Sequence, residues 1–223
     1  KLVPWEESIR VPTLIYHPDL KKQQKCESII SNIDLVPTIL EFSGLDKDTI
    51  NTNYPELKGT SFANMVENVD HKNNRDNEGH LIHGVQIIPT VFNVAEKFRH
   101  IGLADSLIDK FKAFATKGNF LPDFSPPLNY KGVVDKRYKF IRYFSPRENN
   151  IPNTFAELSN NNASFQLYDL LNDPYEMHDI SKTENNKGLL MSMNDKLNKL
   201  TDKEIGLENH ILHLPGPDWF WTT

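Results

Sequence analysis

The alternating pattern between residues 130 and 144 constrains the fold of this chain most. Residues 130–134 and 138–144 alternate apolar and polar side chains on either side of a turn at Asp135-Lys136, which predicts a β-hairpin. Residues 165–170 have the composition of a third strand, and leucine and methionine recur at helical spacing over 189–200. We therefore expect the last part of the chain to form a small antiparallel sheet with one packed amphipathic helix.

The front of the chain predicts a different unit. Residues 11–16 are apolar and β-branched and are followed by Pro18, which favours a strand buried on both faces, as in a parallel sheet. Residues 28–44 carry apolar side chains close to helical spacing, and Gly44 is suited to end that helix. A strand followed by a helix forms an α/β piece, so the predicted fold class is α/β.

The middle of the chain has weaker patterns. Residues 46–80 are polar and predict surface loops, with a turn near 57–62 that opens a short helix. Residues 80–91 are apolar enough for one or two strands, and 95–117 have a helical period. We expect two domains, residues 1–127 and residues 128–223, with 46–127 as a variable, insertion-like region of the first.

Composition excludes several classes of protein. The chain has 223 residues, a net charge of -5 and a mean hydropathy of -0.53, with 38% hydrophobic residues. Such an acidic balance argues against a nucleic-acid partner, and no run approaches the roughly 20 apolar residues of a membrane span. The single cysteine, Cys26, excludes an internal disulfide framework and a cysteine-based zinc cluster.

Few residues carry a recognisable chemical pattern. Nucleophile-elbow, dinucleotide-binding, P-loop and zinc-protease motifs are all absent from the sequence. His80 and His83 lie three residues apart, a spacing that suits metal ligands on a helix, but their surroundings are strand-like and favour ordinary histidines. Cys26 precedes a predicted helix, but no catalytic partner for its thiol is identifiable.

The first residues are the remaining candidates. Lys1, Glu6 and Arg10 lead directly into the predicted strand. A lysine that enters a sheet at its edge can serve as a point charge for an anionic ligand. In the alternative interpretation, Glu6 and Arg10 pair with each other across a turn and Lys1 is solvated. Both interpretations stay open on the residues alone.

The chain resembles the sulfatase family of the alkaline-phosphatase superfamily in five blocks that occur in the family's order. Residues 1–12 are similar to its K-x-x-x-aromatic-E-x-x-x-R-V-P segment, and residues 31–40 to its V-D-L-x-P-T-L helix. Residues 57–62 resemble its short G-x-S-L segment. Residues 135–141 resemble its R-Y-K-Y-I strand, and residues 167–176 its E-L-Y-D-L-x-x-D-P-x-E motif.

This resemblance implies a fold, an activity and the part of the enzyme that this chain forms. It implies the back part of an alkaline-phosphatase-like α/β sandwich followed by a small C-terminal domain, in an arylsulfatase-like enzyme that hydrolyses sulfate esters. A formylglycine nucleophile and a bound calcium or other divalent metal carry that reaction in the family. This chain has no C/S-x-P-x-R motif from which formylglycine is made. We therefore expect it to be the C-terminal portion of a sulfatase, inactive alone, with the nucleophile and the metal in a missing N-terminal half.

The resemblance places one residue of this chain in the active site. Lys1 matches the family's lysine that contacts the substrate sulfate, so we expect it to be the catalytic and substrate-binding residue. Glu6 and Arg10 match positions that we interpret as structural, and no residue of this chain is expected to bind metal. A cut through a covered sheet also predicts an exposed apolar face.

Two other functions stay open. The chain can be a non-catalytic binding module with a sulfatase-like fold, or part of a phosphonate or phosphodiester hydrolase of the same superfamily. The expected partners are a sulfate-ester substrate, the N-terminal half and a further copy of the chain in a homo-oligomer. The sequence makes no prediction of the particular ester or of the compartment.

Overall fold

The computed structural model describes residues 4–18, 23–68, 75–85, 129–144, 152–160 and 164–206. Its elements, in chain order and with two short 3-10 helices (η), are α1 (Glu6–Ile9), η1 (Asn32–Asp34), α2 (Leu35–Phe42), α3 (Lys47–Asn53), α4 (Ala63–Glu67), α5 (Arg75–Glu78), β1 (His80–Val85), β2 (Asn129–Val134), β3 (Tyr138–Phe144), α8 (Phe155–Asn160), β4 (Ser164–Asp169), η2 (Glu184–Asn186) and α9 (Lys187–Glu204).

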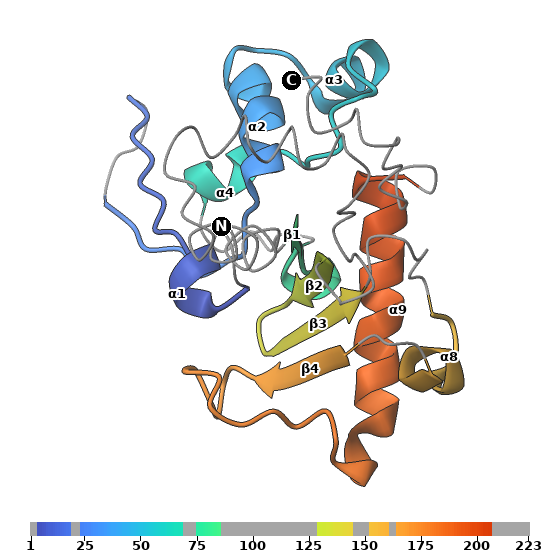
Figure 1. Ribbon diagram of the computed structural model, residues 1–223. Helices are drawn as coiled ribbons and strands as arrows, with labels where there is room; N and C mark the ends of the chain where they lie inside the picture. Colours follow the sequence, from blue (N-terminus) through green and yellow to red (C-terminus); the bar gives the residue numbers. More distant parts are fainter. Residues whose placement is uncertain are drawn as a thin grey trace, which may run out of the picture.

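The four strands form one antiparallel sheet in the order β1-β2-β3-β4, which confirms the predicted hairpin and third strand (Figure 1). One row across the sheet pairs Leu81 with Val133, Val133 with Phe140, and Phe140 with Leu167. The β2–β3 turn is held by the carboxylate of Asp135, which accepts hydrogen bonds from two following backbone amides at 2.9 and 2.7 Å. Side-chain capping of this kind explains why a turn without glycine closes the hairpin.

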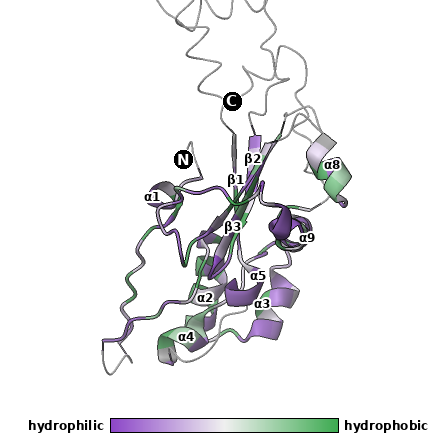
Figure 2. Ribbon diagram, turned by 90° about the horizontal axis from the view of Figure 1, so that it is seen from below, coloured by the Kyte–Doolittle hydropathy of each residue, from purple (hydrophilic) through white to green (hydrophobic). Residues whose placement is uncertain are grey.

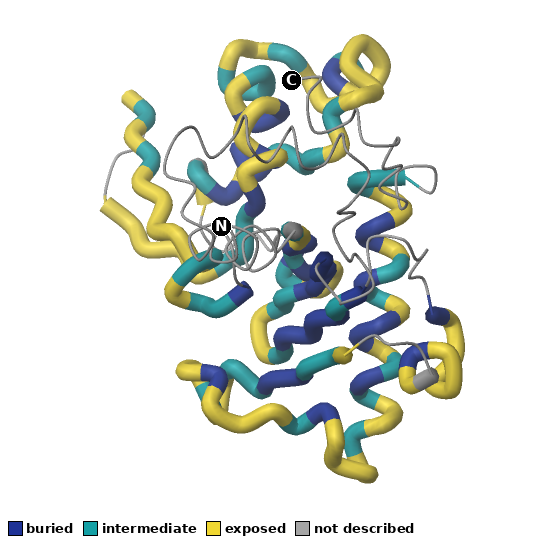
Figure 3. The backbone as a smooth tube through the Cα atoms, in the orientation of Figure 1, coloured by how far each residue is buried: buried dark blue, intermediate teal, exposed yellow. Residues whose placement is uncertain are grey.

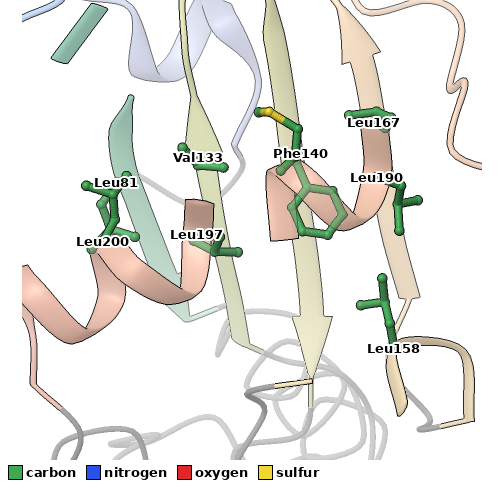
Figure 4. Packing of buried hydrophobic residues seen from close by; sticks show 9 residues of the cluster. Leu81, Val133, Phe140, Leu158, Leu167, Leu190, Leu197 and Leu200 are labelled. Carbon is green, nitrogen blue, oxygen red and sulfur yellow. The ribbon is translucent and has the colours of Figure 1, made fainter. Parts of the chain in front are cut away.

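Helix α9 covers one face of this sheet and builds the main core. Strand side chains of the Leu81–Leu167 row meet the apolar stripe of α9, and α8 adds Leu158 (Figure 4). Leu190 and Leu197 are 0% exposed, and burial of each such side chain contributes about 1.5–3 kcal/mol. The predicted packed helix, and with it the mixed α/β fold class with an antiparallel sheet, is therefore confirmed.

The opposite face of the sheet receives the front of the chain. Ile82, Tyr130, Ile141 and Tyr168 form a second buried cluster, against which Trp5 and Ile9 pack. Seen along its edge, the sheet lies between α1 on one side and α9 on the other (Figure 2). The four-residue helix α1 is thus placed beside strands that follow it by more than a hundred residues in the sequence.

The predicted strand at residues 11–16 is wrong. This segment pairs with no strand among the described residues, and all of its residues except the half-buried Ile15 are exposed (Figure 3). Leu14 is 96% exposed and Tyr16 is 88% exposed. An apolar β-branched run fits a parallel strand only where neighbouring strands supply hydrogen bonds and cover both faces, and the described residues supply neither.

The predicted helix over 28–44 is confirmed in part, since η1 and α2 cover residues 32–42. Gly44, with φ +99, follows the last turn in the left-handed conformation that ends many helices. The expectation of loops over 46–80 is wrong at α3 and α5, which lie in this range. Asp46 caps α3 by accepting a hydrogen bond from the Thr49 amide at 2.8 Å, and the expected short helix after 57–62 is α4.

Several predictions lie outside the described residues, namely the helix over 95–117 and the strand content of 86–91. The boundary between domains at residues 127 and 128 stays a prediction, although the sheet takes β1 from the first part and β2–β4 from the second. Within the described ranges, no helix is both long and apolar enough to cross a bilayer.

Candidate functional site

Lys1 lies outside the described residues. The described part of the candidate site therefore begins at Pro4. Pro4 is buried, and Trp5 contacts Tyr168 edge to face with 6.1 Å between the ring centroids. Helix α1 begins at Glu6, and its two acidic residues, Glu6 and Glu7, lie at the helix end that favours negative charge. Four residues after Lys1, at Trp5, the chain is therefore in contact with the sheet.

Glu6 takes part in a buried ion triad. We use this name for Glu6, Lys139 and Glu176, whose side chains are 17%, 0% and 1% exposed. The ammonium of Lys139 lies 3.3 Å from Glu6 Oε1 and forms an ion pair with Glu176 Oε1. The backbone amide of Glu6 donates a hydrogen bond of 2.8 Å to Glu176 Oε2. Because a buried charge is stable only when it is paired, the three groups depend on one another.

The side chain of Arg10 does not form the pair with Glu6 that the alternative interpretation predicts. Its backbone amide donates to the carbonyl of Glu6 at 2.9 Å, which closes α1, but its side chain is exposed. Among the described residues, the carboxylate of Glu6 pairs with Lys139 and not with Arg10.

Glu176 reaches the triad from a tight turn after β4. Its amide donates to the carbonyl of Asp173 at 3.2 Å, and Asp173 Oδ2 accepts from the amide of His178 at 2.7 Å. The φ of Glu176 is 56°, the one positive value among the described non-glycine residues. A left-handed conformation is costly for a residue with a Cβ atom, so the surrounding contacts must hold it.

A second buried network centres on Asp34, which is 0% exposed. Its carboxylate accepts hydrogen bonds from the amides of Ser31 and Thr60, both at 2.8 Å, and from Arg75 Nε and Nη2 at 2.5 and 2.7 Å. Arg75 Nη1 also donates to Glu204 of α9 at 2.8 Å. Burial works against the charge of Arg75, but Asp34 and Glu204 outweigh it and raise the pKa of the guanidinium. This network joins η1, α5 and α9.

The two histidines of β1 do not form a shared site. Residues three apart on a strand point to opposite faces of the sheet, so His80 and His83 diverge. Burial, and secondly the charge of Arg75, lower the pKa of His80 to about 4, so its imidazole is neutral near pH 7. Over the described ranges, no group of three His, Cys, Asp or Glu side chains is arranged to hold a metal ion.

Sequence reasoning missed most of these groups. Lys139, Glu176 and Asp34 all lie in the five sulfatase-like blocks, but, apart from Ser31 beside Asp34, their partners are between 26 and 170 residues away and leave no local signal. Arg75 lies in a run of charged and amide residues that we interpreted as a surface loop. The motif blocks themselves were the available signal, since a glutamate that ends a turn and a lysine inside an apolar strand are both unusual.

A family model matches the part of the chain that holds the first three of the five blocks. Residues 1–95 match the family described as N-sulphoglucosamine sulphohydrolase, C-terminal. Among solved structures, the phosphonate monoester hydrolase of Agrobacterium radiobacter aligns over 77% of this chain at 18% identity with a TM-score of 0.42. The chain spans 25% of the length of that enzyme. The resemblance to the sulfatase family is thereby confirmed, and the match to the family model extends over residues 1–95.

Proposed function

We propose that this chain is the C-terminal portion of a sulfuric-ester hydrolase. In this proposal an N-terminal half supplies the formylglycine nucleophile and the divalent metal, and this chain supplies Lys1 as a contact to the substrate sulfate. The observation that carries the proposal is the ion triad. Its three members come from three separate sulfatase-like blocks and meet at one point, so the blocks act as parts of one structure.

The exposed apolar surface supports the need for a covering part. Large hydrophobic side chains of residues 11–16 and of η1 and α2 lie in solvent: Val11, Leu14, Tyr16, Ile33, Leu35, Val36 and Ile39. Soluble monomers keep such patches small, and larger ones mark a surface that another chain or domain covers. An N-terminal half that packs against α2 would bury these residues.

The role of Lys1 follows from elementary electrostatics. A lysine ammonium is a compact positive charge that neutralises a sulfate group, most strongly where water is excluded. Among the described residues, no group of three His, Cys, Asp or Glu side chains is arranged to hold a metal ion. The metal and the nucleophile belong to the proposed N-terminal half.

The test is hydrolysis by the complete protein. We expect it to hydrolyse an aryl sulfate ester in the presence of calcium faster than an aryl phosphonate ester, and we expect the 223-residue chain alone to hydrolyse neither. Lys1→Ala should lower kcat/KM for the sulfate by about 100-fold, the usual cost of one electrostatic contact in an active site. The control is Lys25→Ala, since Lys25 is exposed and pairs only with Glu27 in the described structure.

The other outcomes distinguish the alternatives. Faster turnover of the phosphonate ester than of the sulfate ester would favour a phosphonate hydrolase of the same superfamily over a sulfatase. No turnover of either ester by the complete protein would favour a non-catalytic module. An equal loss of kcat/KM in the Lys1→Ala and Lys25→Ala variants would contradict a contact between Lys1 and the sulfate.

A further inference from the structure

We propose that Glu176 and Lys139 are positioning residues that hold residues 4–9, and through them Lys1, in place. The inference rests on the proposed function in one respect, namely that Lys1 contacts the sulfate. The anchoring itself is a separate claim about described residues, and it can be tested on this chain alone.

Among the described residues, the side-chain hydrogen bonds and ion pairs of residues 4–9 converge on the triad. Helix α1 contributes no buried residue of its own. It is attached by the Glu6 amide at 2.8 Å from Glu176 Oε2, by Glu6 Oε1 at 3.3 Å from Lys139 Nζ, and by the packing of Trp5 and Ile9 on the cluster that includes Tyr168. Lys1 is three residues from the buried Pro4, so their Cα atoms are at most about 11 Å apart. An anchor at Glu6 therefore limits where Lys1 can reach.

The burial pattern around Glu176 points to a task for its carboxylate. Glu176 is the one buried residue between 171 and 179, whereas its neighbours Tyr175 and Met177 are 76% and 74% exposed. Glutamate is normally among the last side chains to be buried, and tyrosine and methionine are normally buried before it. This turn does the reverse, so apolar packing does not explain why it lies against the sheet.

The backbone conformation of Glu176 is a second, independent indication that its carboxylate has a positioning role. Its φ of 56° is a conformation that favours glycine, and strain of this kind gathers at functional sites. A glycine at this position would relieve the strain, but it would lose the carboxylate that bonds to Glu6. A glutamate at this strained position is expected if its carboxylate is needed to hold residues 4–9 in place.

Two substitutions separate anchoring from folding. Glu176→Gly removes the carboxylate and relieves the backbone, so the sheet should stay folded while residues 4–9 come loose. Glu176→Gln keeps an oxygen that can accept from the Glu6 amide and loses only the charge that pairs with Lys139. The matched control is Glu7→Gln, because Glu7 is an exposed acid on the same helix.

The first readout is amide hydrogen exchange of this chain, followed by mass spectrometry. We expect exchange in a peptide covering residues 4–10 to accelerate at least tenfold in Glu176→Gly, less in Glu176→Gln, and not at all in Glu7→Gln. Peptides from β2–β4 report whether the core stays folded. They should exchange somewhat faster in Glu176→Gly, because Lys139 of β3 loses a buried partner, but the acceleration at residues 4–10 should be larger. Unchanged exchange at residues 4–10 in Glu176→Gly would overturn the anchor.

The second readout is kcat/KM of the complete protein in a double-mutant cycle. If Glu176 acts through Lys1, then Glu176→Gly should lower kcat/KM about tenfold, and adding it to Lys1→Ala should cause no further loss. Losses that simply multiply would overturn the positioning role even if the anchor holds. If the wild-type complete protein hydrolyses no sulfate ester, the proposed function and the positioning of Lys1 fail together, while the exchange result still decides the anchor.

Discussion

Removal of the Asp34 carboxylate is the sharpest test of the buried network. Asp34→Ala removes the acceptor of four hydrogen bonds, two from backbone amides and two from Arg75. It also leaves the guanidinium of Arg75, which is 3% exposed, with one carboxylate partner, Glu204, in place of two. The substitution therefore combines lost hydrogen bonds with a buried charge whose compensation is incomplete.

The expected cost can be given from these contacts. Breaking a buried ion pair by removing one partner costs about 3–5 kcal/mol. A domain of this size has a total free energy of unfolding of about 5–15 kcal/mol, so the loss is a large fraction of it. At about 2–4 °C per kcal/mol, Tm should fall by roughly 6–20 °C.

Urea denaturation followed by circular dichroism measures this cost, with Glu184→Ala as the control. Glu184 pairs with Lys187 at a site where both side chains are exposed, 80% and 48%, so its removal should cost less than about 1 kcal/mol. A loss below about 1 kcal/mol in Asp34→Ala, equal to the control, would refute the reasoning, because it would mean that the network is not buried in solution.

Two further predictions concern single positions. A Cβ atom on Gly59 would lie 2.0 Å from the carbonyl oxygen of Ile33, so Gly59→Ala should lower the free energy of unfolding by at least about 1–3 kcal/mol in urea denaturation. Gly188→Ala in α9, where nothing lies within 4 Å, should instead raise it by up to about 1 kcal/mol, and equal effects would contradict the clash. The pKa of His80 is lowered from 6.5 to about 4, so the unfolded chain binds more protons between these values and stability is lost as pH falls through that window. His80→Gln should abolish about 3 kcal/mol of that pH dependence, and an NMR titration of His80 with a midpoint near 6.5 would contradict it.

Local patterns predicted the elements whose own residues determine them. The hairpin follows from alternation in β2 and β3, and α9 follows from a leucine stripe that meets the sheet. The interpretation of residues 11–16 failed because a strand needs partners, and the described structure supplies none. Composition cannot distinguish a buried apolar run from one that is left exposed.

The candidate site was less predictable for a related reason. Family blocks marked Lys1, Glu6 and Arg10, but the role of Glu6 depends on Lys139 and Glu176, which lie 133 and 170 residues further along the chain. Asp34 and Arg75 are likewise 41 residues apart. Contacts over such distances appear only once the fold brings the segments together, so one-dimensional spacing could not indicate them.

These separations also bear on the order in which the chain folds. The sheet joins β2, β3 and β4 between neighbours in the sequence, whereas the Glu6–Glu176 and Arg75–Glu204 contacts close loops of 170 and 129 residues. Closing long loops costs chain entropy before any contact repays it, so both ion networks should form after the β2–β4 meander. Substitutions in them should therefore accelerate unfolding and leave the folding rate nearly unchanged. We therefore expect the β2–β4 meander to form without the two ion networks, and the networks to stabilise the native state by slowing its unfolding.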